Sequence, residues 1–394
     1  MREQKGIYLD YAATTPVDER VLNEMLPFFK TVQGNPSSMH RSGREAKKAL
    51  EIMRQKVAKI LNTKSEEIIF TGSGTESDNL AIIGAAHAYK NIGKHIIVSS
   101  IEHKAVLNSA KFLEKEGFEI SYTPVNSDGV VDVEELMKLI RPDTILISVM
   151  LVNNEVGTIQ PIEEISKRIS EVRKGRTTPI FHTDACQAPC ILEIHPYKLG
   201  VDLLTLNGAK IYGPKGAGCL FVRKGVHLEP VIQGGGQEFG LRSGTESIAQ
   251  IAGFALALEL SQSMIADENS RLKSLMKLFR EGIQKNISGV TFNTPQKNSI
   301  PSILNVSFSQ TEGESILLDL DENNIYCSTG SACASADLNP SHVLLAMSVP
   351  LELAHSSLRF SLGRMTTEEE IKKAIEVLPK VVERIRSICP KNIN

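Results

Sequence analysis

The chain has 394 residues, of which 41% are hydrophobic and 23% charged, and its formal net charge is −2 at pH 7. This length supports a large core and two domains, and the small net charge predicts no direct binding to nucleic acid or to a membrane. The first residues lead into a strand-like segment without a signal-peptide core. The most apolar run, residues 145–152, suits a buried strand rather than a membrane span. We therefore expect a cytoplasmic protein.

Helices and strands are predicted to alternate up to residue 221. A short strand at 7–11 and a small-residue turn at 12–16 precede helices at 17–29 and 44–61. Strands follow at 68–71, 96–99, 119–122, 144–152, 180–184, 201–205 and 218–221, with helices between them at 75–88, 104–116, 133–140 and 162–172. Such alternation is typical of a mostly parallel sheet covered by helices on both faces.

The pattern changes after a long helical region at 248–285, which we expect to bridge two domains. Beyond it we predict strands at 304–308 and 358–361, helices at 314–322, 341–347 and 367–388, and a loop at about 327–338. The predicted class is α/β, with a large cofactor-binding domain at 16–260. Residues 1–15 and 261–394 form a smaller α+β domain, which carries the 327–338 loop.

The six cysteines are scattered along the chain. Only Cys186 and Cys190 are closely spaced, and no second pair completes a zinc site, so no metal site is predicted. A disulfide framework is not expected in a reducing compartment. Most of these thiols are expected to be small core residues. Cys333 differs, because the surrounding STGSACASA sequence is small and flexible, which suits an exposed, mobile thiolate.

Residues 71–76, TGSGTE, join a predicted strand to a helix. Backbone amides near Gly74 and the helix N-terminus favour an anion, and Thr75 adds a hydroxyl. The spacing matches neither a dinucleotide fingerprint nor a P-loop, so one phosphate is favoured over two or three. An ordinary capped turn explains these residues equally well when they are taken alone.

Asp184 and Lys210 follow two consecutive predicted strands. A carboxylate at the end of so apolar a strand needs a cationic or proton-donating partner, such as the ring nitrogen of pyridoxal phosphate. Gln187 could reach the phenolic oxygen of that ring. Small residues leave open space beside Lys210. An amine that attacks an aldehyde needs such space. Taken alone, Asp184 could cap the following segment and Lys210 could be a surface lysine. Together with the predicted phosphate-binding residues at 71–76, they favour pyridoxal 5'-phosphate.

Three further polar residues have a functional interpretation. His103 follows a strand and can stack on a flat ring and move protons near neutral pH. Asn154 can fix a ring oxygen or a substrate carboxylate. Arg359 lies at alternating strand spacing and can bind a carboxylate through two hydrogen bonds. The alternatives are a solvent-exposed histidine, a polar turn and a surface ion pair.

These motifs, in this order, resemble the cysteine desulfurases of the NifS/IscS type, within the class V aminotransferase branch of the fold-type I pyridoxal phosphate enzymes. The resemblance runs nearly from end to end. The matching segments are YLDYAATTP at 8–16, GTESDN at 74–79, EHK at 102–104, NNEVG at 153–157, KIYGPKG at 210–216, RSGT at 242–245 and RFSLGR at 359–364.

The resemblance implies how the cofactor and the substrate would be held. Lys210 would carry the cofactor covalently, with Asp184 at the ring nitrogen, Gln187 at the phenolic oxygen and His103 on the ring face. Asn154 and Arg359 would hold the substrate carboxylate. The remaining cofactor-binding residues would be Gly74, Thr75 and Asn207, with Thr245 reaching in from the second subunit of a homodimer.

The resemblance also implies a reaction. Cys333 would take the sulfur of L-cysteine as a persulfide, leaving L-alanine. It would then pass the sulfur to an acceptor protein, such as an iron–sulfur scaffold or a tRNA-thiolation protein. Selenocysteine lyase-like β-elimination is an alternative, although selenide release needs no protein thiol. A non-catalytic docking protein that has kept the fold is another, although the joint presence of Lys210, Asp184, His103 and Cys333 argues against it.

Two features depart from the family pattern. Ala209 stands where a histidine usually precedes the lysine and helps to bind phosphate, and Asn207 stands where a serine is common. We therefore expect a thinner phosphate shell and weaker cofactor retention, and Ala209 keeps the docking-protein alternative open. The segment after the last helix is also shorter than in relatives that use it to dock an iron–sulfur scaffold. A different docking mode or partner is therefore expected.

Overall fold

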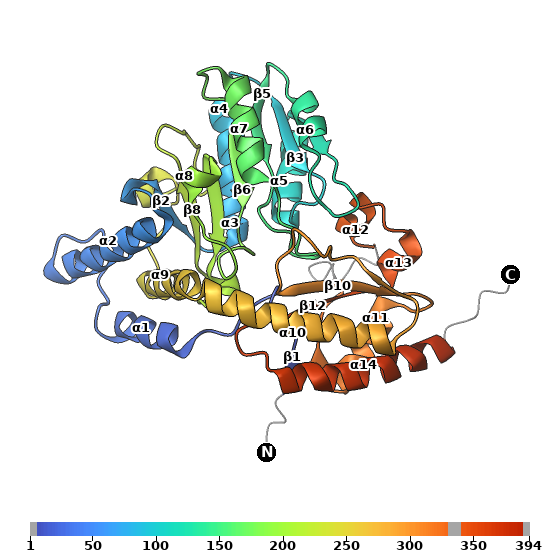
Figure 1. The fold of residues 1–394 in the computed structure, drawn as a ribbon. Coiled ribbons are helices and arrows are strands. Elements are labelled where there is room, and N and C mark those ends of the chain that lie inside the picture. Colours follow the sequence, from blue (N-terminus) through green and yellow to red (C-terminus); the bar gives the residue numbers. More distant parts are fainter. Residues whose placement is uncertain (1–5, 330–339, 389–394) are drawn as a thin grey trace.

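Figure 1 presents a computed structural model of the chain, which describes residues 6–329 and 340–388. A seven-stranded sheet forms the centre of the upper lobe. Neighbouring strands are parallel, except that β8 is antiparallel to both β2 and β7. The predicted α/β class with a mostly parallel sheet is confirmed. In order across the sheet the strands are β2 (Ile68–Thr71), β8 (Gly218–Val222), β7 (Leu203–Asn207), β6 (Ile180–Asp184), β5 (Thr144–Ser148), β3 (His95–Ser99) and β4 (Glu119–Thr123).

Helices cover both faces of this sheet, because successive buried residues point to opposite sides. Ile69 and Ile96 pack into one hydrophobic cluster, whereas Phe70 and Ile97 pack into the other. A one-residue slip of a strand would exchange the two sets, so the two-sided burial fixes the register. The first face carries α3 (Gly74–Asn79), α4 (Ala85–Tyr89) and α5 (Lys104–Lys115); the second carries α2 (Arg41–Leu61), α6 (Val133–Leu139), α7 (Ile162–Arg173) and α9 (Ile248–Ser263).

Three elements differ in detail from their predicted ranges. The helix predicted at 75–88 contains a π-helical segment, Leu80–Gly84, between α3 and α4. The strand predicted at 144–152 ends at Ser148. The chain turns further on, where Asn153 accepts the amides of Glu155 and Val156. The region at 248–285 is two helices, α9 and α10 (Ile265–Asn286), which meet at Met264.

No single helix within the described part of the chain is long and apolar enough to cross a membrane. The α9–α10 pair meets the criteria of length and composition only when its two helices are taken together, and it is bent by 68°.

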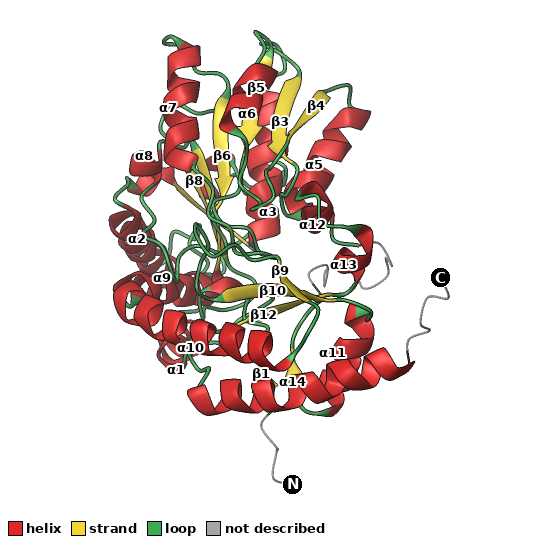
Figure 2. Ribbon diagram, turned by 45° about the vertical axis from the view of Figure 1, so that its right-hand side comes forward, coloured by secondary structure: helices red, strands yellow, loops and turns green. Residues whose placement is uncertain are grey.

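The lower lobe has an antiparallel sheet of its own (Figure 2). It has the order β12 (Ser357–Ser361), β10 (Ile303–Phe308), β9 (Val290–Phe292), and β1 (Ile7–Tyr8) pairs in parallel with β11 (Ile325–Tyr326) nearby. The N-terminal segment therefore lies with this lobe, although the domain bounds at 15/16 and 260/261 remain a prediction. The remaining helices are α1 (Glu19–Lys30), α8 (Pro196–Leu199), α11 (Gly313–Glu322), α12 (His342–Ala346), α13 (Leu351–His355) and α14 (Glu368–Ile388).

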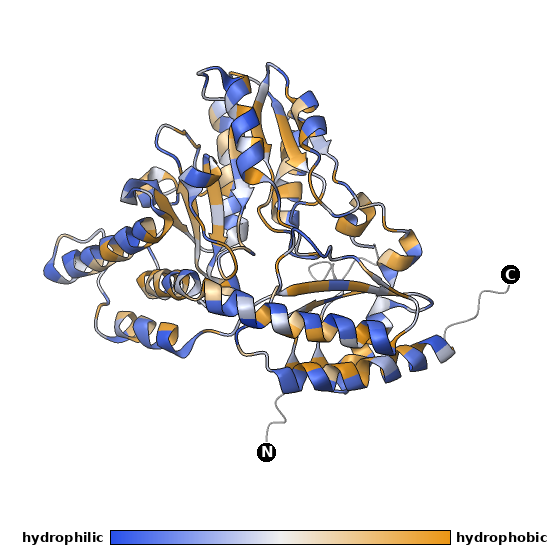
Figure 3. Ribbon diagram, in the orientation of Figure 1, coloured by the Kyte–Doolittle hydropathy of each residue, from blue (hydrophilic) through white to orange (hydrophobic). Residues whose placement is uncertain are grey.

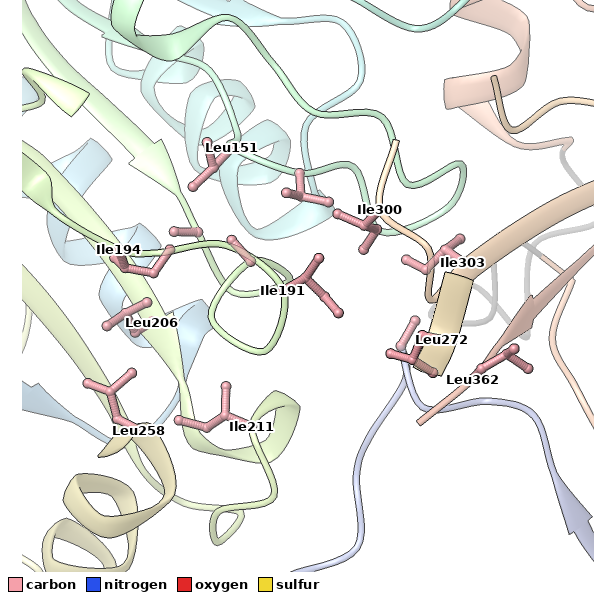
Figure 4. Close-up of a cluster of buried hydrophobic side chains, with 14 of the residues drawn as sticks. Leu151, Ile191, Ile194, Leu206, Ile211, Leu258, Leu272, Ile300, Ile303 and Leu362 are labelled. Atoms are coloured by element: carbon pink, nitrogen blue, oxygen red, sulfur yellow. The ribbon is translucent and has the colours of Figure 1, made fainter. Parts of the chain in front are cut away.

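A continuous apolar core joins the two lobes. The strands of both sheets are hydrophobic, whereas the outer faces of the helices are hydrophilic (Figure 3). Figure 4 shows side chains of the central region, such as Leu206 and Leu151, in the same cluster as Ile303 and Leu362 of the lower lobe. This packing sets where residues of the lower lobe meet the edge of the central sheet.

Candidate active site

A cavity of about 340 Å³ lies beyond the carboxyl ends of the central strands. Because β2, β6 and β7 run in the same direction, the loops that follow them emerge at one edge of the sheet, where ligands bind in folds of this kind. Residues from both lobes and from the N-terminal turn line the cavity. The predicted site residues among them are Gly74, Thr75, His103, Asn154, Asp184, Gln187, Asn207, Lys210 and Arg359.

Lys210 ends the short 3₁₀ segment Gly208–Lys210 that follows β7. Its Nζ atom donates hydrogen bonds to the backbone oxygens of Ala12 (2.9 Å) and Ala13 (2.5 Å). Gln187 Nε2 also donates to the Ala12 oxygen, at 2.9 Å. The small-residue turn at 12–16 therefore lies directly against the lysine, where its lack of bulk keeps the cavity open.

Asp184 is the last residue of β6 and is 6% exposed. Its Oδ1 accepts the Cys186 amide at 2.8 Å, which orients the carboxylate. The start of α3 is held close by. A Cβ atom at Gly74 would come within 2.8 Å of Cys186 Sγ, so glycine is required for this close approach. Asn207 Oδ1 accepts the Ala209 amide at 3.1 Å and so shapes the turn before Lys210.

His103 caps the N-terminus of α5. Its Nδ1 accepts the Ala105 amide at 3.1 Å, which assigns the proton of the neutral ring to Nε2. The ring lies in the cavity wall, near His342, whose Nε2 is 3.0 Å from the Glu102 oxygen. This environment differs from the solvent-exposed histidine of the alternative interpretation.

Arg359 comes from β12 of the lower lobe and is 3% exposed. Its Nη2 donates to Asp10 Oδ1 at 2.8 Å and its Nη1 to the Asn154 oxygen at 3.0 Å. Its buried Nε has no hydrogen-bond partner among the described residues. The interpretation as a surface ion pair is therefore wrong. An unsatisfied buried donor is costly, so an anion at this end of the cavity would stabilise it.

Several cavity residues had no role in the sequence interpretation: Asp78, Glu155, Cys186 and His342. Asp78 belongs to the GTESDN segment and Glu155 to NNEVG, so both lie within recognised motifs, yet their burial could not be foreseen. Burial raises the pKa of Glu155 to about 7, although the hydrogen bond that Ser341 donates to it lowers the pKa in part. Burial also lowers the pKa of His342. Among these residues, Glu155 is therefore the group that can change protonation near neutral pH.

The described cysteines are poor nucleophiles. Burial raises the pKa of the thiols of Cys186, Cys190, Cys219 and Cys327, so each is a neutral thiol at physiological pH. As predicted, Cys186 and Cys219 are buried, and Cys190 and Cys327 are partly buried against the core. Cys333 lies outside the described residues. Thr245 is exposed and does not line this cavity.

Comparisons with known proteins agree with this geometry. The aminotransferase class-V family model matches residues 7–374. A cysteine desulfurase IscS from Dictyoglomus turgidum is 49% identical over 98% of this chain and 97% of its own length. The chain belongs to the cysteine desulfurase branch of the class V aminotransferase family. The resemblance drawn from the sequence is thus confirmed.

Solved structures of proteins with similar sequences have the same fold. A NifS-like protein superposes with a TM-score of 0.89 at 38% identity and covers 96% of this chain and 100% of its own. The structure of SspA in complex with cysteine gives a TM-score of 0.78 at 36% identity, with 90% of this chain and 98% of the other covered. The similarity therefore extends over both lobes and not the central sheet alone.

Class V aminotransferases in general depend on pyridoxal 5'-phosphate. The residues present fit this cofactor. A primary amine, that of Lys210, lies in the cavity wall, and the buried carboxylate of Asp184 needs a cationic partner. Glycine at position 74 lets the start of α3 pack against Cys186 and Asn207, and the hydroxyl of Thr75 and the amide of Asn207 line the same cavity, where polar groups suit a phosphate.

Proposed function

We propose that this cysteine desulfurase uses pyridoxal 5'-phosphate, bound in the 340 Å³ cavity, to transfer the sulfur of L-cysteine to Cys333, with L-alanine as the second product. The observation that carries the proposal is the convergence of Lys210, Asp184 and Arg359 in one cavity. An amine, a buried carboxylate and a buried guanidinium are the groups that an amino-acid substrate and this cofactor together require.

The cofactor would be held by residues on four sides of the cavity. Lys210 would bind it covalently through Nζ, Asp184 would face the ring nitrogen and Gln187 the phenolic oxygen. Its phosphate would lie at Gly74, Thr75 and Asn207. When bound, the cofactor supplies an electron sink for negative charge that develops on the substrate.

The residues of the chain would orient the substrate and move its protons. Arg359 and Asn154 would bind the carboxylate of L-cysteine, which fixes its α-carbon beside Lys210. Lys210 Nζ would take the proton from that carbon and return it. His103 Nε2 would exchange a proton with the substrate amine or thiol. Asp184 would keep the proton on the ring nitrogen, because a charged carboxylate with low exposure interacts strongly with a cation.

Cys333 would complete the sulfur transfer. Its thiolate forms a bond to the sulfur of L-cysteine while the carbon–sulfur bond of the substrate breaks. The electron pair of that bond stays with the carbon, which takes up a proton and becomes the methyl group of L-alanine. The persulfide on Cys333 then passes its outer sulfur to an acceptor protein. The raised thiol pKa values of the four described cysteines support this assignment, since none of them offers a thiolate.

The exposure of Thr245 supports a homodimer in which this residue serves the neighbouring subunit. A surface groove of about 860 Å³ shares Thr75, His103 and Lys104 with the cavity and opens beside it. A second copy of the chain could place its Thr245 against the phosphate through this groove. The reaction starts from a free thiol on Cys333, which a reducing compartment preserves, so we keep the cytoplasm as the proposed location.

One experiment tests the enzyme and the thiol together. The purified protein is examined by visible absorbance before and after borohydride. Alanine and sulfide are then measured after addition of L-cysteine and a small thiol, which reduces the persulfide and releases its outer sulfur as sulfide. The native chain should lose its visible band on reduction and form both products, and Lys210→Ala should lack the band. Cys333→Ala should keep the band but fail to release sulfur. A native protein without a reducible band would overturn the proposal, and thiol-dependent sulfur release from Cys333→Ala would overturn the persulfide step.

A further inference from the structure

A second carboxyl group, that of Asp78, lies beside Asp184 in the cavity. Asp78 belongs to α3 and is 1% exposed. Its Oδ1 atom has no hydrogen-bond partner among the described residues, although Asp78 lines the cavity. A buried carboxylate oxygen without a donor is costly in its charged form. Asp184 differs, because the Cys186 amide donates to it.

A chain of neutral groups lies behind Asp78. Ser148 Oγ is 2.9 Å from His182 Nδ1, and His182 Nε2 is 3.1 Å from Thr205 Oγ1. Thr205 in turn lies close enough to Asp78 to lower the pKa of its carboxyl. His182 Nε2 lies 3.6 Å from Asp78 Oδ1, which is too long for a hydrogen bond. Burial lowers the pKa of His182 to about 4, so this imidazole is neutral and forms no ion pair with Asp78.

The charges that act on Asp78 are negative. It faces Asp184 from β6 and Glu102 from the loop after β3, and both disfavour a further anion. Burial, the charge of Asp184 and the charge of Glu102 raise the pKa of Asp78 well above its usual range, and Thr205 opposes them only in part. Cys186, which also lines this part of the cavity, is a neutral thiol.

We propose that Asp78 is a positioning residue that holds one proton in the folded enzyme, so that Asp184 alone carries the negative charge that faces the cofactor. The inference rests on the proposed function, since it takes Asp184 as the partner of the ring nitrogen. Two carboxyl groups in a site of low dielectric constant do not both ionise, and the better-solvated one keeps the charge. Asp184 is expected to keep the charge, because its carboxylate accepts a hydrogen bond from the Cys186 amide, whereas one oxygen of Asp78 has no partner among the described residues.

The protonation of Asp78 can be measured on the cofactor-free protein. Infrared spectroscopy in the carboxylic acid C=O region, at a pH above 7, should show a band that disappears in Asp78→Asn. The pH is chosen so that Glu102 and Glu155, whose pKa values are about 7, are mostly ionised. Asp319→Asn is the matched control, because Asp319 is a buried carboxylate that is ion-paired with Arg384 at 2.7 Å, and its loss should remove no such band.

Cofactor affinity supplies the second measurement. Asp78→Asn mimics the protonated carboxyl and should bind pyridoxal 5'-phosphate within about two-fold of the native protein. Asp78→Ala removes the polar group beside Thr205 and Asp184 and should bind about ten-fold more weakly, the factor expected for one lost polar interaction. Equal weakening by both variants would overturn the proposal, and so would an unchanged infrared spectrum in Asp78→Asn. A native chain that binds no cofactor would instead overturn the proposed function, while the infrared result would still report on Asp78.

Discussion

Replacement of Arg359 by lysine tests how the substrate is recognised. In the Arg359 guanidinium, Nη2 donates a hydrogen bond to Asp10 and Nη1 donates one to the Asn154 oxygen. Its buried Nε has no hydrogen-bond partner among the described residues. A lysine places one nitrogen where arginine has three, so it cannot satisfy Asp10 and also bind a carboxylate through two hydrogen bonds. One charge-assisted hydrogen bond contributes about 1.5–3 kcal/mol. We therefore expect kcat/KM for L-cysteine to fall about 10- to 150-fold, mainly through KM.

The assay follows alanine formation over a range of L-cysteine concentrations. Arg280→Lys is the matched control: Arg280 is also partly buried, but its guanidinium lies over the Phe292 ring and does not line the cavity. Cofactor content and thermal unfolding of each variant separate substrate binding from damage to the fold. An Arg359→Lys enzyme with native cofactor content and a KM within two-fold of the native value would refute the assignment of Arg359 to the carboxylate.

Three further outcomes follow from the site. Burial raises the pKa of Glu155 from 4.5 to about 7, so the folded state holds a proton that the unfolded state has released. The stability that this proton contributes is complete below the unfolded pKa and is lost as pH rises through about 7. The free energy of unfolding of the cofactor-free protein in urea should therefore fall between pH 5 and pH 8 by up to about 3 kcal/mol more than that of Glu155→Gln. An equal fall in the two proteins would contradict the assignment. Ala209→His should bind pyridoxal 5'-phosphate about ten-fold more tightly by adding a phosphate contact, and unchanged affinity would remove the idea of a thinner shell. Cys327→Ala should form alanine at a near-native rate, because its thiol is buried and neutral.

The sequence predicts most of the architecture because the spacing of apolar residues and the positions of polar ones are enough to distinguish strands, helices and loops. Alternating strands and helices indicated a mostly parallel sheet, and polar residues at strand ends indicated the edge where the site lies. Asp184 and Lys210 could be singled out because an acid after an apolar strand and a lysine among glycines are unusual in the local sequence. Their neighbourhood follows from the parallel order of β6 and β7.

The parts that could not be predicted depend on contacts between distant segments. The role of Arg359 could be proposed from its strand spacing, but its burial against Asp10 and the Asn154 oxygen could not. Asp78 had no role in the sequence interpretation, and only the packing of α3 against β7 and β8 buries it beside Asp184. The break at Met264 was missed because neither proline nor glycine marks it.

The measurement that tests the central claim most directly is the mass of the peptide that contains Cys333 after a single turnover. The native enzyme is mixed with one equivalent of L-cysteine without reductant, alkylated, digested and analysed by mass spectrometry. The account predicts the mass gain of one sulfur atom on Cys333, alanine in equal amount, and no gain on Cys186, Cys190, Cys219 or Cys327. Alanine formation with no added sulfur on Cys333 would contradict it.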